Sequence, residues 1–483
     1  MERKKTLSNS SLPHSDIMTR SSANTIDRPK VLVFYTSIIA VFLVIQLTQD
    51  VIQGALQSPW VLTTFKLADV NTCIILSTAP TIKGIIFFFC ISILCFPLLQ
   101  DLYRNLGSIK LRGLWRTIVV SISAAIIIYL LTFSLGNDGM GLNYARISVR
   151  PFNQDSTEYS TRLLMPAIAY FLHLRGFWLY YIFFIILTIS FIALLYAWNE
   201  ENAHLNFWQF VSLCTSSFVI FQFEIPGYPD ILVFIFFILV MWGQLSSKSK
   251  LSLLILALIT HESSALIALV LAWRYLQRKD FITYISVVIV YGFIWFVASG
   301  FSFNPILASH YIAGQSGLTW LIQSPLQEII GILIAFKALW ILLIFGMVLA
   351  FRQKLFADAM LIIGCVVAAL VMTGIGVDTS RLIGYAFPSL LIAISIIKTN
   401  PNKISKQIFS LIFLANLCIP SFNSVLSSGI AFPPGLYELL YYLLAKFFGI
   451  NYSIIWIANI NMIKGNSYEI FYDTLVLWIP LLL

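Results

Sequence analysis

Five ionisable residues lie within long apolar runs or directly at their ends: Asp230, His261, Glu262, Asp378 and Arg381. Inside a bilayer such side chains are costly, so they usually face a partner, a cavity or a substrate. A histidine beside a carboxylate is suited to proton transfer, to donating to a phosphate or to binding a metal. An arginine offers planar paired donors that fit a phosphate. These residues therefore predict a site that handles a phosphorylated molecule.

The pair His261-Glu262 is the strongest of these signals, and both residues are candidates for catalysis. They interrupt an apolar run in the sequence Thr-His-Glu-Ser-Ser. The pattern differs from the zinc-protease motif HExxH, because Ala265 stands four residues after His261. A zinc protease is therefore not expected. The alternative to a catalytic role is a pair that only stabilises the local backbone.

The longest internal polar loop, residues 136–162, supplies further candidates. Asp138 is a candidate general base or metal ligand, although an aspartate in Asn-Asp-Gly is also typical of a simple turn. Arg146, Arg150 and Arg162 are candidates to bind phosphate, since guanidinium groups bind it in a bidentate way. The alternative for these arginines is contact with solvent or lipid headgroups.

Two shorter turns carry the remaining candidates for substrate binding. Tyr228 and Asp230 belong to a Pro-Gly-Tyr-Pro-Asp turn, and a carboxylate at a helix start can instead interact with the positive end of the helix dipole. Asp378 and Arg381 stand three residues apart, so we expect Arg381 to face a diphosphate while Asp378 orients it. The alternative is that the two side chains only pair with each other.

The composition predicts the class of protein that must position these residues. The chain has 483 residues, of which 59% are hydrophobic and 11% charged, and its mean hydropathy is +0.88. We expect an all-α, polytopic membrane protein with about 11–13 transmembrane helices in a single domain, 31–483. It should include a re-entrant helical hairpin and an exterior loop, followed after Pro166 by an interfacial helix. The expected spans are residues 31–48, 84–100, 117–135, 177–198, 207–224, 230–246, 281–300, 328–351, 358–376, 382–397 and 407–427, with further apolar material from 437.

Charge and cysteine content narrow the expectations further. Residues 1–30 are rich in Ser, Thr, Asn and basic residues and predict a disordered cytoplasmic tail. The net charge of +9 arises from short basic clusters between apolar runs, a pattern of topology determinants rather than of nucleic-acid binding. The six cysteines contain no CxxC pattern, so neither a disulfide framework nor a metal site is expected.

The apolar run 251–273 determines the topology. If it crossed the membrane once, the basic loops 352–357 and 398–406 would lie outside. If it enters and returns as two half-helices, every basic loop stays inside. We therefore predict a re-entrant hairpin with its tip at residues 260–264, the alternative being one tilted span. Five residues should then surround one cavity on the exterior side: Asp138, Asp230, His261, Glu262 and Arg381.

Between residues 117 and 397 the order of motifs resembles the multi-pass glycosyltransferases of the GT-C superfamily. These motifs are an exterior loop with an acidic residue, then Arg-Leu-Leu-x-Pro, Tyr-Pro-Asp, Thr-His-Glu-Ser and Asp-Thr-Ser-Arg. The resemblance implies that the acidic loop residue, here Asp138, is the catalytic base. It also implies a sugar donor carried on polyprenyl phosphate or diphosphate, and a divalent cation in some members. The loop follows the third expected span rather than the first, so Asp50 or Asp69 is the alternative base.

The resemblance implies transfer of a sugar from a lipid-linked donor to a glycan or lipid acceptor, at the exterior face of the plasma (bacterial inner) membrane. Tyr144, Tyr159 and Tyr228 are expected to stack on sugar rings. A polymerase or ligase of lipid-linked glycans, similar to an O-antigen polymerase, is the alternative, and it would depend on the loop arginines more than on Asp138. A transporter or flippase is the second alternative, because broken helices suit transport. Membrane lipids are expected partners, and nucleic acid is not.

Overall fold

The structure is a computed structural model, and all the residues that it describes belong to one compact unit, residues 50–483. The described residues are 82–105, 111–131, 139–149, 151–152, 162–224, 226–242, 244–298, 325–376, 378–400, 404–419, 423–425 and 429–431. The predicted tail 1–30 and the first expected span, 31–48, lie outside the described residues.

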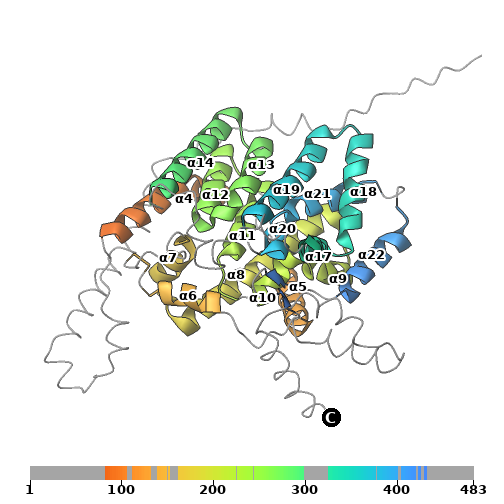
Figure 1. Cartoon of the computed structure of the whole chain (residues 1–483), viewed down its shortest axis with the longest axis horizontal. Helices are drawn as coiled ribbons and strands as arrows, with labels where there is room; N and C mark the ends of the chain where they lie inside the picture. Colours follow the sequence, from red (N-terminus) through yellow and green to blue (C-terminus); the bar gives the residue numbers. More distant parts are fainter. Residues whose placement is uncertain are drawn as a thin grey trace, which may run out of the picture. The chain divides into compact units, whose positions relative to one another are not determined.

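Helices dominate the described residues (Figure 1), as the composition predicts. The first are α4 (Ile82–Asn105), α5 (Leu111–Leu131), α6 (Gly139–Ile147), α7 (Leu164–Phe171), α8 (Phe177–Trp198), α9 (Phe207–Cys214), α10 (Ser217–Glu224), α11 (Asp230–Trp242), α12 (Ser247–Thr260), α13 (Ala265–Tyr275) and α14 (Arg278–Ala298). The others are α17 (Pro325–Phe336), α18 (Leu339–Arg352), α19 (Phe356–Ile375), α20 (Thr379–Gly384), α21 (Phe387–Lys398) and α22 (Lys406–Cys418). One short antiparallel pair departs from the all-α expectation, with β1 (Asn423–Val425) beside β2 (Gly429–Ala431).

Four expected spans are interrupted in the structure. The run 382–397 is divided between α20 and α21 at residues 385–386. The run 207–224 forms two helices, α9 and α10, which are separated at Thr215 and Ser216; the hydroxyl of Thr215 donates to the carbonyl of Ser212 at 2.8 Å. The run 328–351 is split into α17 and α18, which meet at 76°, and Lys337 at the break has a φ of 48°. The span expected at 407–427 ends with α22, and β1 follows it.

Length and apolar character support membrane association. Two described helices, α8 and α19, contain stretches long and apolar enough to cross a bilayer, and α17 with α18 adds a third if the bent pair counts as one span. Shorter apolar stretches lie in α4, α5, α11, α21 and α22. Large apolar side chains are exposed on α5, α14, α19 and α22, where a membrane would cover them. The total of about 11–13 spans remains a prediction.

The predicted hairpin is present in the structure. Helix α12 ends at Thr260, His261 is extended, and a 3₁₀ turn at Glu262–Ser264 leads into α13. The backbone N–H of Gln277, just after α13, donates to the hydroxyl of Ser247 at the start of α12 at 3.0 Å. The two outer ends of the hairpin therefore lie together, and the single tilted span is wrong. The side of the membrane on which they lie remains a prediction.

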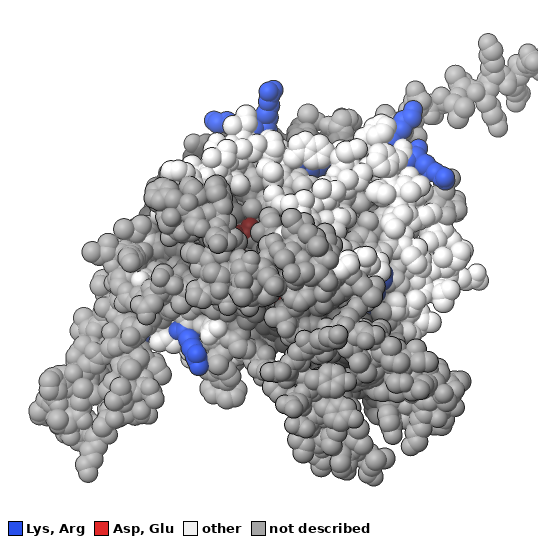
Figure 2. All heavy atoms as spheres, viewed as in Figure 1, with Lys and Arg blue, Asp and Glu red and all other residues white. Residues whose placement is uncertain are grey.

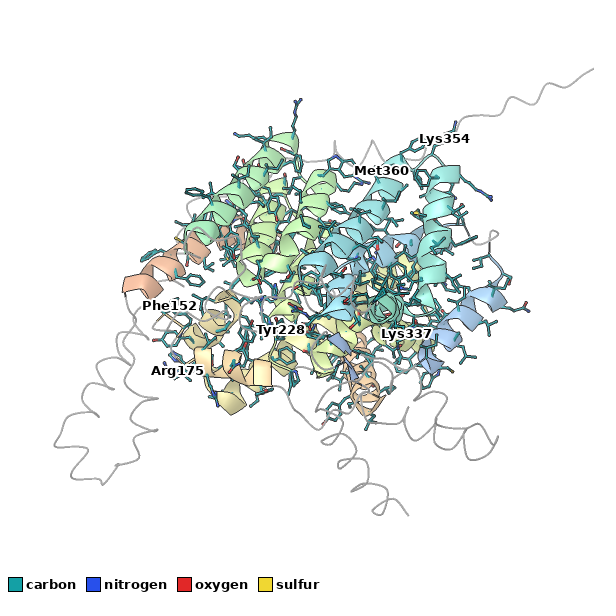
Figure 3. The ribbon with its side chains drawn as sticks, in the orientation of Figure 1. Phe152, Arg175, Tyr228, Lys337, Lys354 and Met360 are labelled. Atoms are coloured by element: carbon teal, nitrogen blue, oxygen red, sulfur yellow. The ribbon has the colours of Figure 1, made fainter. Side chains whose placement is uncertain are left out.

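Helix ends with basic residues gather on the same side as the outer ends of this hairpin. Arg274 forms an ion pair with Asp358 at 3.1 Å, which joins the end of α13 to the start of α19. Asp101 of α4 accepts from the backbone N–H of Ser246 at 2.7 Å. Lys and Arg side chains appear along the upper edge in Figure 2, and Lys354 is labelled there in Figure 3. We call this side, which holds Ser247, Arg274, Gln277 and Lys354, the basic end.

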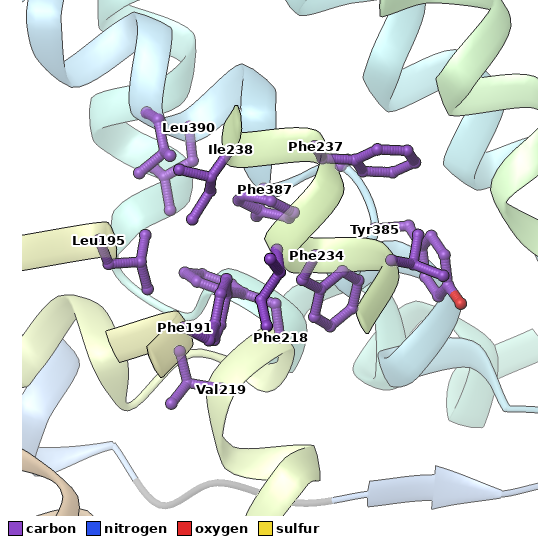
Figure 4. Close-up of a cluster of buried hydrophobic side chains, with 14 of the residues drawn as sticks. Phe191, Leu195, Phe218, Val219, Phe234, Phe237, Ile238, Tyr385, Phe387 and Leu390 are labelled. Carbon is purple, nitrogen blue, oxygen red and sulfur yellow. The ribbon is translucent and has the colours of Figure 1, made fainter. Parts of the chain in front are cut away.

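An aromatic core holds the centre of the helical assembly together (Figure 4). Phe218 of α10 stacks on Phe387 of α21 with ring centroids 5.0 Å apart, and Phe191 of α8 lies 5.8 Å from Phe234 of α11. Phe234 also contacts Tyr385 edge to face at 5.0 Å. Such aromatic pairs add to the free energy gained by burying their large apolar surfaces. The core thereby fixes α11, which begins at Asp230, against α21 and against α20, which contains Arg381.

Helix α7 corresponds to the predicted interfacial helix, but it does not lie on the surface of the fold. Leu164, Met165, Pro166, Ala167, Ala169 and Tyr170 are all buried. The helix therefore packs inward among its neighbours, because its apolar residues surround it rather than form one stripe. This burial also anchors Arg162, which lies two residues before the helix.

Candidate functional site

A close approach between two glycines positions the first wall of the site. Gly227 has a φ of +95°, which disfavours any residue with a side chain. A Cβ on Gly141 would lie 1.9 Å from the carbonyl oxygen of Pro226, so α6 can approach this turn only with glycine there. Tyr180 secures the turn by donating to the carbonyl of Gly227 at 3.0 Å. The result is an edge-to-face contact between Tyr144 and Tyr228, with centroids 5.4 Å apart.

Arg162 lies at the centre of this wall and joins it to the tip of the hairpin. Its Nε is 3.1 Å from both carboxylate oxygens of Glu262, and its Nη2 also donates to that carboxylate. Its Nη1 donates to the hydroxyls of Tyr228 at 2.6 Å and Tyr144 at 3.2 Å. The Arg162 side chain is 5% exposed and that of Glu262 is 21% exposed. A charge buried this deeply requires a paired partner, and Glu262 provides it.

His261 has one ring nitrogen committed to the backbone. Its Nδ1 accepts from the N–H of Ser263 at 3.1 Å, so in the neutral ring the proton belongs to Nε2. Nε2 lies 3.4 Å from the hydroxyl of Tyr228, 3.4 Å from Nη1 of Arg381 and 3.7 Å from a carboxylate oxygen of Asp230. This arrangement suits a hydrogen-bond donor rather than a general base, because no lone pair of the neutral ring remains available.

The carboxylate of Asp230, at the first residue of α11, receives donors from α20 and the residue after it. Tyr385 donates to its Oδ1 at 2.6 Å, and Arg381 donates to its Oδ2 at 3.3 Å. Arg381 also pairs with Asp378 through Nε at 3.1 Å, as their spacing of three residues predicts. Asp378 and Arg381 thus form the expected pair, and Arg381 also contacts Asp230. This geometry is compatible both with a pair alone and with an Arg381 that Asp378 orients toward a diphosphate.

The two arginines lie against the same tyrosine. The guanidinium carbon of Arg381 is 4.7 Å from the ring centroid of Tyr228, and that of Arg162 is 5.9 Å from it. Burial raises the pKa of Tyr228 to about 12, although both arginines oppose this shift. The phenol therefore stays protonated near neutral pH, and its hydroxyl accepts from Arg162. Tyr228 is labelled near the middle of Figure 3.

We call these contacting residues the central cluster: Tyr144, Arg162, Tyr228, Asp230, His261, Glu262, Asp378, Arg381 and Tyr385. The expectation that Asp230, His261, Glu262 and Arg381 meet is confirmed by their distances. Their surroundings differ from the expected open cavity, because Asp230 and His261 are fully buried. Only Glu262 among these four has appreciable exposure, so in this structure the cluster is closed.

Several predicted residues do not join the central cluster. Arg146 on α6 is exposed, whereas the neighbouring Tyr144 points inward. Tyr144 and Tyr228 are buried, so their expected stacking on sugar rings is not supported by this structure. The reason is that their rings pack against each other. Outside the described residues lie Asp138, Arg150, Tyr159 and the alternative bases Asp50 and Asp69.

Tyr385 is a member of the central cluster that sequence reasoning missed. It follows Arg381 by four residues, a spacing that places both on one helix face, and this was the available signal. Glu328 on α17 was also missed, although it is buried and its carboxylate accepts from the hydroxyl of Thr379 at 2.6 Å. A lone glutamate near a helix start gives no comparable signal in the sequence.

Within the described residues no three or more His, Cys, Asp or Glu side chains are grouped so that they could hold a metal ion. Comparison with known proteins leaves the family open: no family model matches the chain, and neither a curated protein nor a solved structure shows significant similarity to it.

Proposed function

We propose that this chain is a polytopic membrane enzyme that transfers a sugar from a polyprenyl-phosphate-linked donor to an acceptor on the exterior side. The observation that carries the proposal is that both arginines contact Tyr228: Arg381 lies near its ring, and Arg162 donates to its hydroxyl. Two buried guanidinium groups beside one tyrosine place several N–H donors in a small volume, and carboxylates hold both groups in position. That arrangement suits a leaving phosphate, whose negative charge grows as the glycosidic bond breaks.

The membrane orientation follows from the distribution of basic residues. Helix α12 has 14 residues and therefore spans about 21 Å between the basic end and the tip at His261. Basic loops stay on the cytoplasmic side of membrane proteins. If the basic end is cytoplasmic, the central cluster lies toward the exterior leaflet. A lipid-linked donor would approach it there, and the exposed apolar side chains of α14 and α19 would face lipid.

The contacts of the central cluster suggest a separate role for each residue. Arg381 and Arg162 would stabilise the leaving phosphate, and the Nε2–H of His261 would add a neutral donor. Asp230 and Glu262 hold the two arginines in place through the bonds described above. The base that takes the proton of the acceptor hydroxyl is Asp138 in this proposal, which rests on the sequence alone.

A polymerase or ligase of lipid-linked glycans is the second candidate, and a specific observation favours it. Arg162, rather than any unpaired carboxylate, occupies the centre of the central cluster with bonds to Glu262, Tyr144 and Tyr228. An enzyme that relies on cations to activate a diphosphate would use such an arginine. Both candidates cleave the same bond between a sugar and a lipid phosphate, and they differ in the acceptor and in the importance of Asp138.

The proposal is tested with purified protein in lipid nanodiscs and a radiolabelled polyprenyl-phosphate sugar. Wild-type protein should release the lipid phosphate and label a glycan acceptor. Arg381→Lys should reduce turnover by roughly 10²–10³, because a lysine cannot reproduce the planar donors. Arg274→Lys, at the basic end, is the matched control and should retain turnover. Movement of intact donor across a vesicle membrane without bond cleavage would instead establish a flippase and reject the proposal.

A further inference from the structure

Three helices that pack together, α10, α17 and α20, carry buried polar atoms with unmet hydrogen-bonding capacity. Glu328 on α17 is 2% exposed, and Asp378 just before α20 is 3% exposed. One oxygen of Glu328 accepts from Thr379, and one oxygen of Asp378 contacts Arg381. In the described part of the chain, the second oxygen of each carboxylate has no hydrogen-bond partner. Buried carboxylate oxygens without donors are costly, so native structures rarely retain them without a use.

A third side chain on these helices shares this property. Gln222 on α10 is buried, and within the described residues neither its amide oxygen nor its amide nitrogen has a hydrogen-bond partner. Helix α10 contacts both α17 and α20, and it approaches α20 closely at Gly384, where a Cβ would lie 2.8 Å from the hydroxyl of Ser217. We call the packing of α10, α17 and α20 the junction. It contains two carboxylates that lie close together through the bond from Thr379 to Glu328, and on α10 one amide that both accepts and donates.

The chemistry of these atoms indicates the ligand class. Carboxylate oxygens and a primary amide together match a molecule with several hydroxyl groups, because each hydroxyl both donates and accepts. A cation is a poorer match, since the described residues hold no cluster of three or more acidic, His or Cys ligands. Asp378 also touches Arg381, so the junction adjoins the arginine assigned to the donor phosphate.

We propose that Glu328, Asp378 and Gln222 form the subsite for the polyhydroxylated glycan acceptor. This inference rests on the proposed function, because it names the place where the second substrate of the transfer binds. The free oxygens of Glu328 and Asp378 accept hydrogen bonds from acceptor hydroxyls, and the amide of Gln222 completes the set. Through Asp378 the acceptor then lies beside Arg381, as transfer to an adjacent leaving phosphate requires.

The test measures the two substrates separately in nanodiscs, with a radiolabelled polyprenyl-phosphate sugar and a defined oligosaccharide acceptor. In Glu328→Gln the amide oxygen still accepts from Thr379, while the free acceptor oxygen becomes a donor group. The acceptor KM should rise roughly 10–100-fold, the effect of losing one hydrogen bond to a charged group. The dissociation constant of the lipid-linked donor, measured without acceptor, should stay near the wild-type value. Asp280→Asn, a carboxylate at the basic end bonded to Ser247, is the matched control and should leave the acceptor KM unchanged.

Gln222→Leu is the second variant, and it decides the question if Glu328→Gln fails to fold. A leucine of similar size removes two buried polar atoms without partners, so the variant should unfold at a higher temperature than wild type and still show a raised acceptor KM. Unchanged acceptor KM in the variants that fold would overturn the subsite while leaving sugar transfer intact. A loss of divalent-cation stimulation in Glu328→Gln, with normal acceptor KM, would also overturn it. Absence of donor binding or cleavage in wild-type protein would instead refute the proposed function.

Discussion

Arg162 and Glu262 are 100 residues apart in the chain and form a buried ion pair in which Nε lies 3.1 Å from both carboxylate oxygens. Arg162 precedes α7, and Glu262 lies at the tip of the α12–α13 hairpin. The pair thus joins the end of the long polar loop to the α12–α13 hairpin. Because Tyr144 and Tyr228 accept from the same guanidinium, its position depends on three other segments of the fold.

The first prediction concerns the stability that this pair provides. Glu262→Ala leaves the Arg162 guanidinium buried without its carboxylate, so the free energy of unfolding should fall by about 3–5 kcal/mol. Asp358→Ala, which breaks the half-exposed pair with Arg274, is the control and should cost less than about 1 kcal/mol. Unfolding in mixed micelles measures both. Equal losses in the two variants would contradict a buried, tightly held Arg162.

The second prediction concerns the sidedness of the hairpin. Gln277→Cys, in a background without the native cysteines, should react with an impermeant thiol reagent only after the cells are permeabilised. The reagent should not reach this cysteine in intact cells, because we expect residues 275–279 to lie at the basic end on the cytoplasmic side. A disulfide between Ser247→Cys and Gln277→Cys should form readily, because the Ser247 hydroxyl is 3.0 Å from the N–H of Gln277. Labelling of Gln277→Cys in intact cells would reverse the orientation, although the hairpin geometry would stand.

The break in the hairpin could be predicted because charge placed it there. Basic residues on both sides of the run 251–273 predict that its two ends lie on one side of the membrane, and the polar residues 260–264 mark the point at which the run can reverse. Uniform apolar runs between such loops gave α8 its bounds of Phe177–Trp198, the same as expected. Signals of this kind depend on local sequence and on the bilayer, so a single sequence carries them.

The interruptions at Thr215 and Lys337 could not be predicted in the same way. Neither position carries proline or glycine, so the sequence gives no local signal for the turn at Thr215 or for the left-handed backbone at Lys337. The partners in the central cluster were similarly hidden. The sequence placed Arg162 and Glu262 among the candidates, but only the fold shows that they bind each other rather than two separate groups.

The third prediction uses the titration of Tyr228. Burial raises the pKa of Tyr228 from 10.0 to about 12 in the folded state, so folding favours the protonated phenol. Its contribution to stability is complete below pH 10 and is lost as the pH rises from 10 through 12. Tyr228→Phe should therefore show a smaller fall in the free energy of unfolding across that window than wild type.

The control for this measurement is Phe221→Leu. Phe221 contacts the ring of Tyr228 edge to face at 5.7 Å, so the substitution disturbs the same packing but removes no titrating group. Its stability should be lower at every pH, while the slope between pH 10 and 12 should match that of wild type. An identical slope in Tyr228→Phe and wild type would show that this phenol does not titrate differently in the folded and unfolded states.

The last prediction separates the two candidate enzymes by comparing Asp138→Asn with Arg162→Lys. In a transferase with Asp138 as the general base, the asparagine keeps the shape but cannot take the proton, so turnover should fall by ~10²–10⁴ while the donor still binds. In a polymerase or ligase that depends on its arginines, Arg162→Lys should be the more severe change, because a lysine cannot hold Glu262, Tyr144 and Tyr228 together. Release of lipid phosphate and donor affinity, measured side by side, give the ranking. Near-normal turnover in Asp138→Asn would remove that residue from the role of base and direct the search to Asp50, to Asp69 or to Glu158, another acidic residue of the loop 136–162.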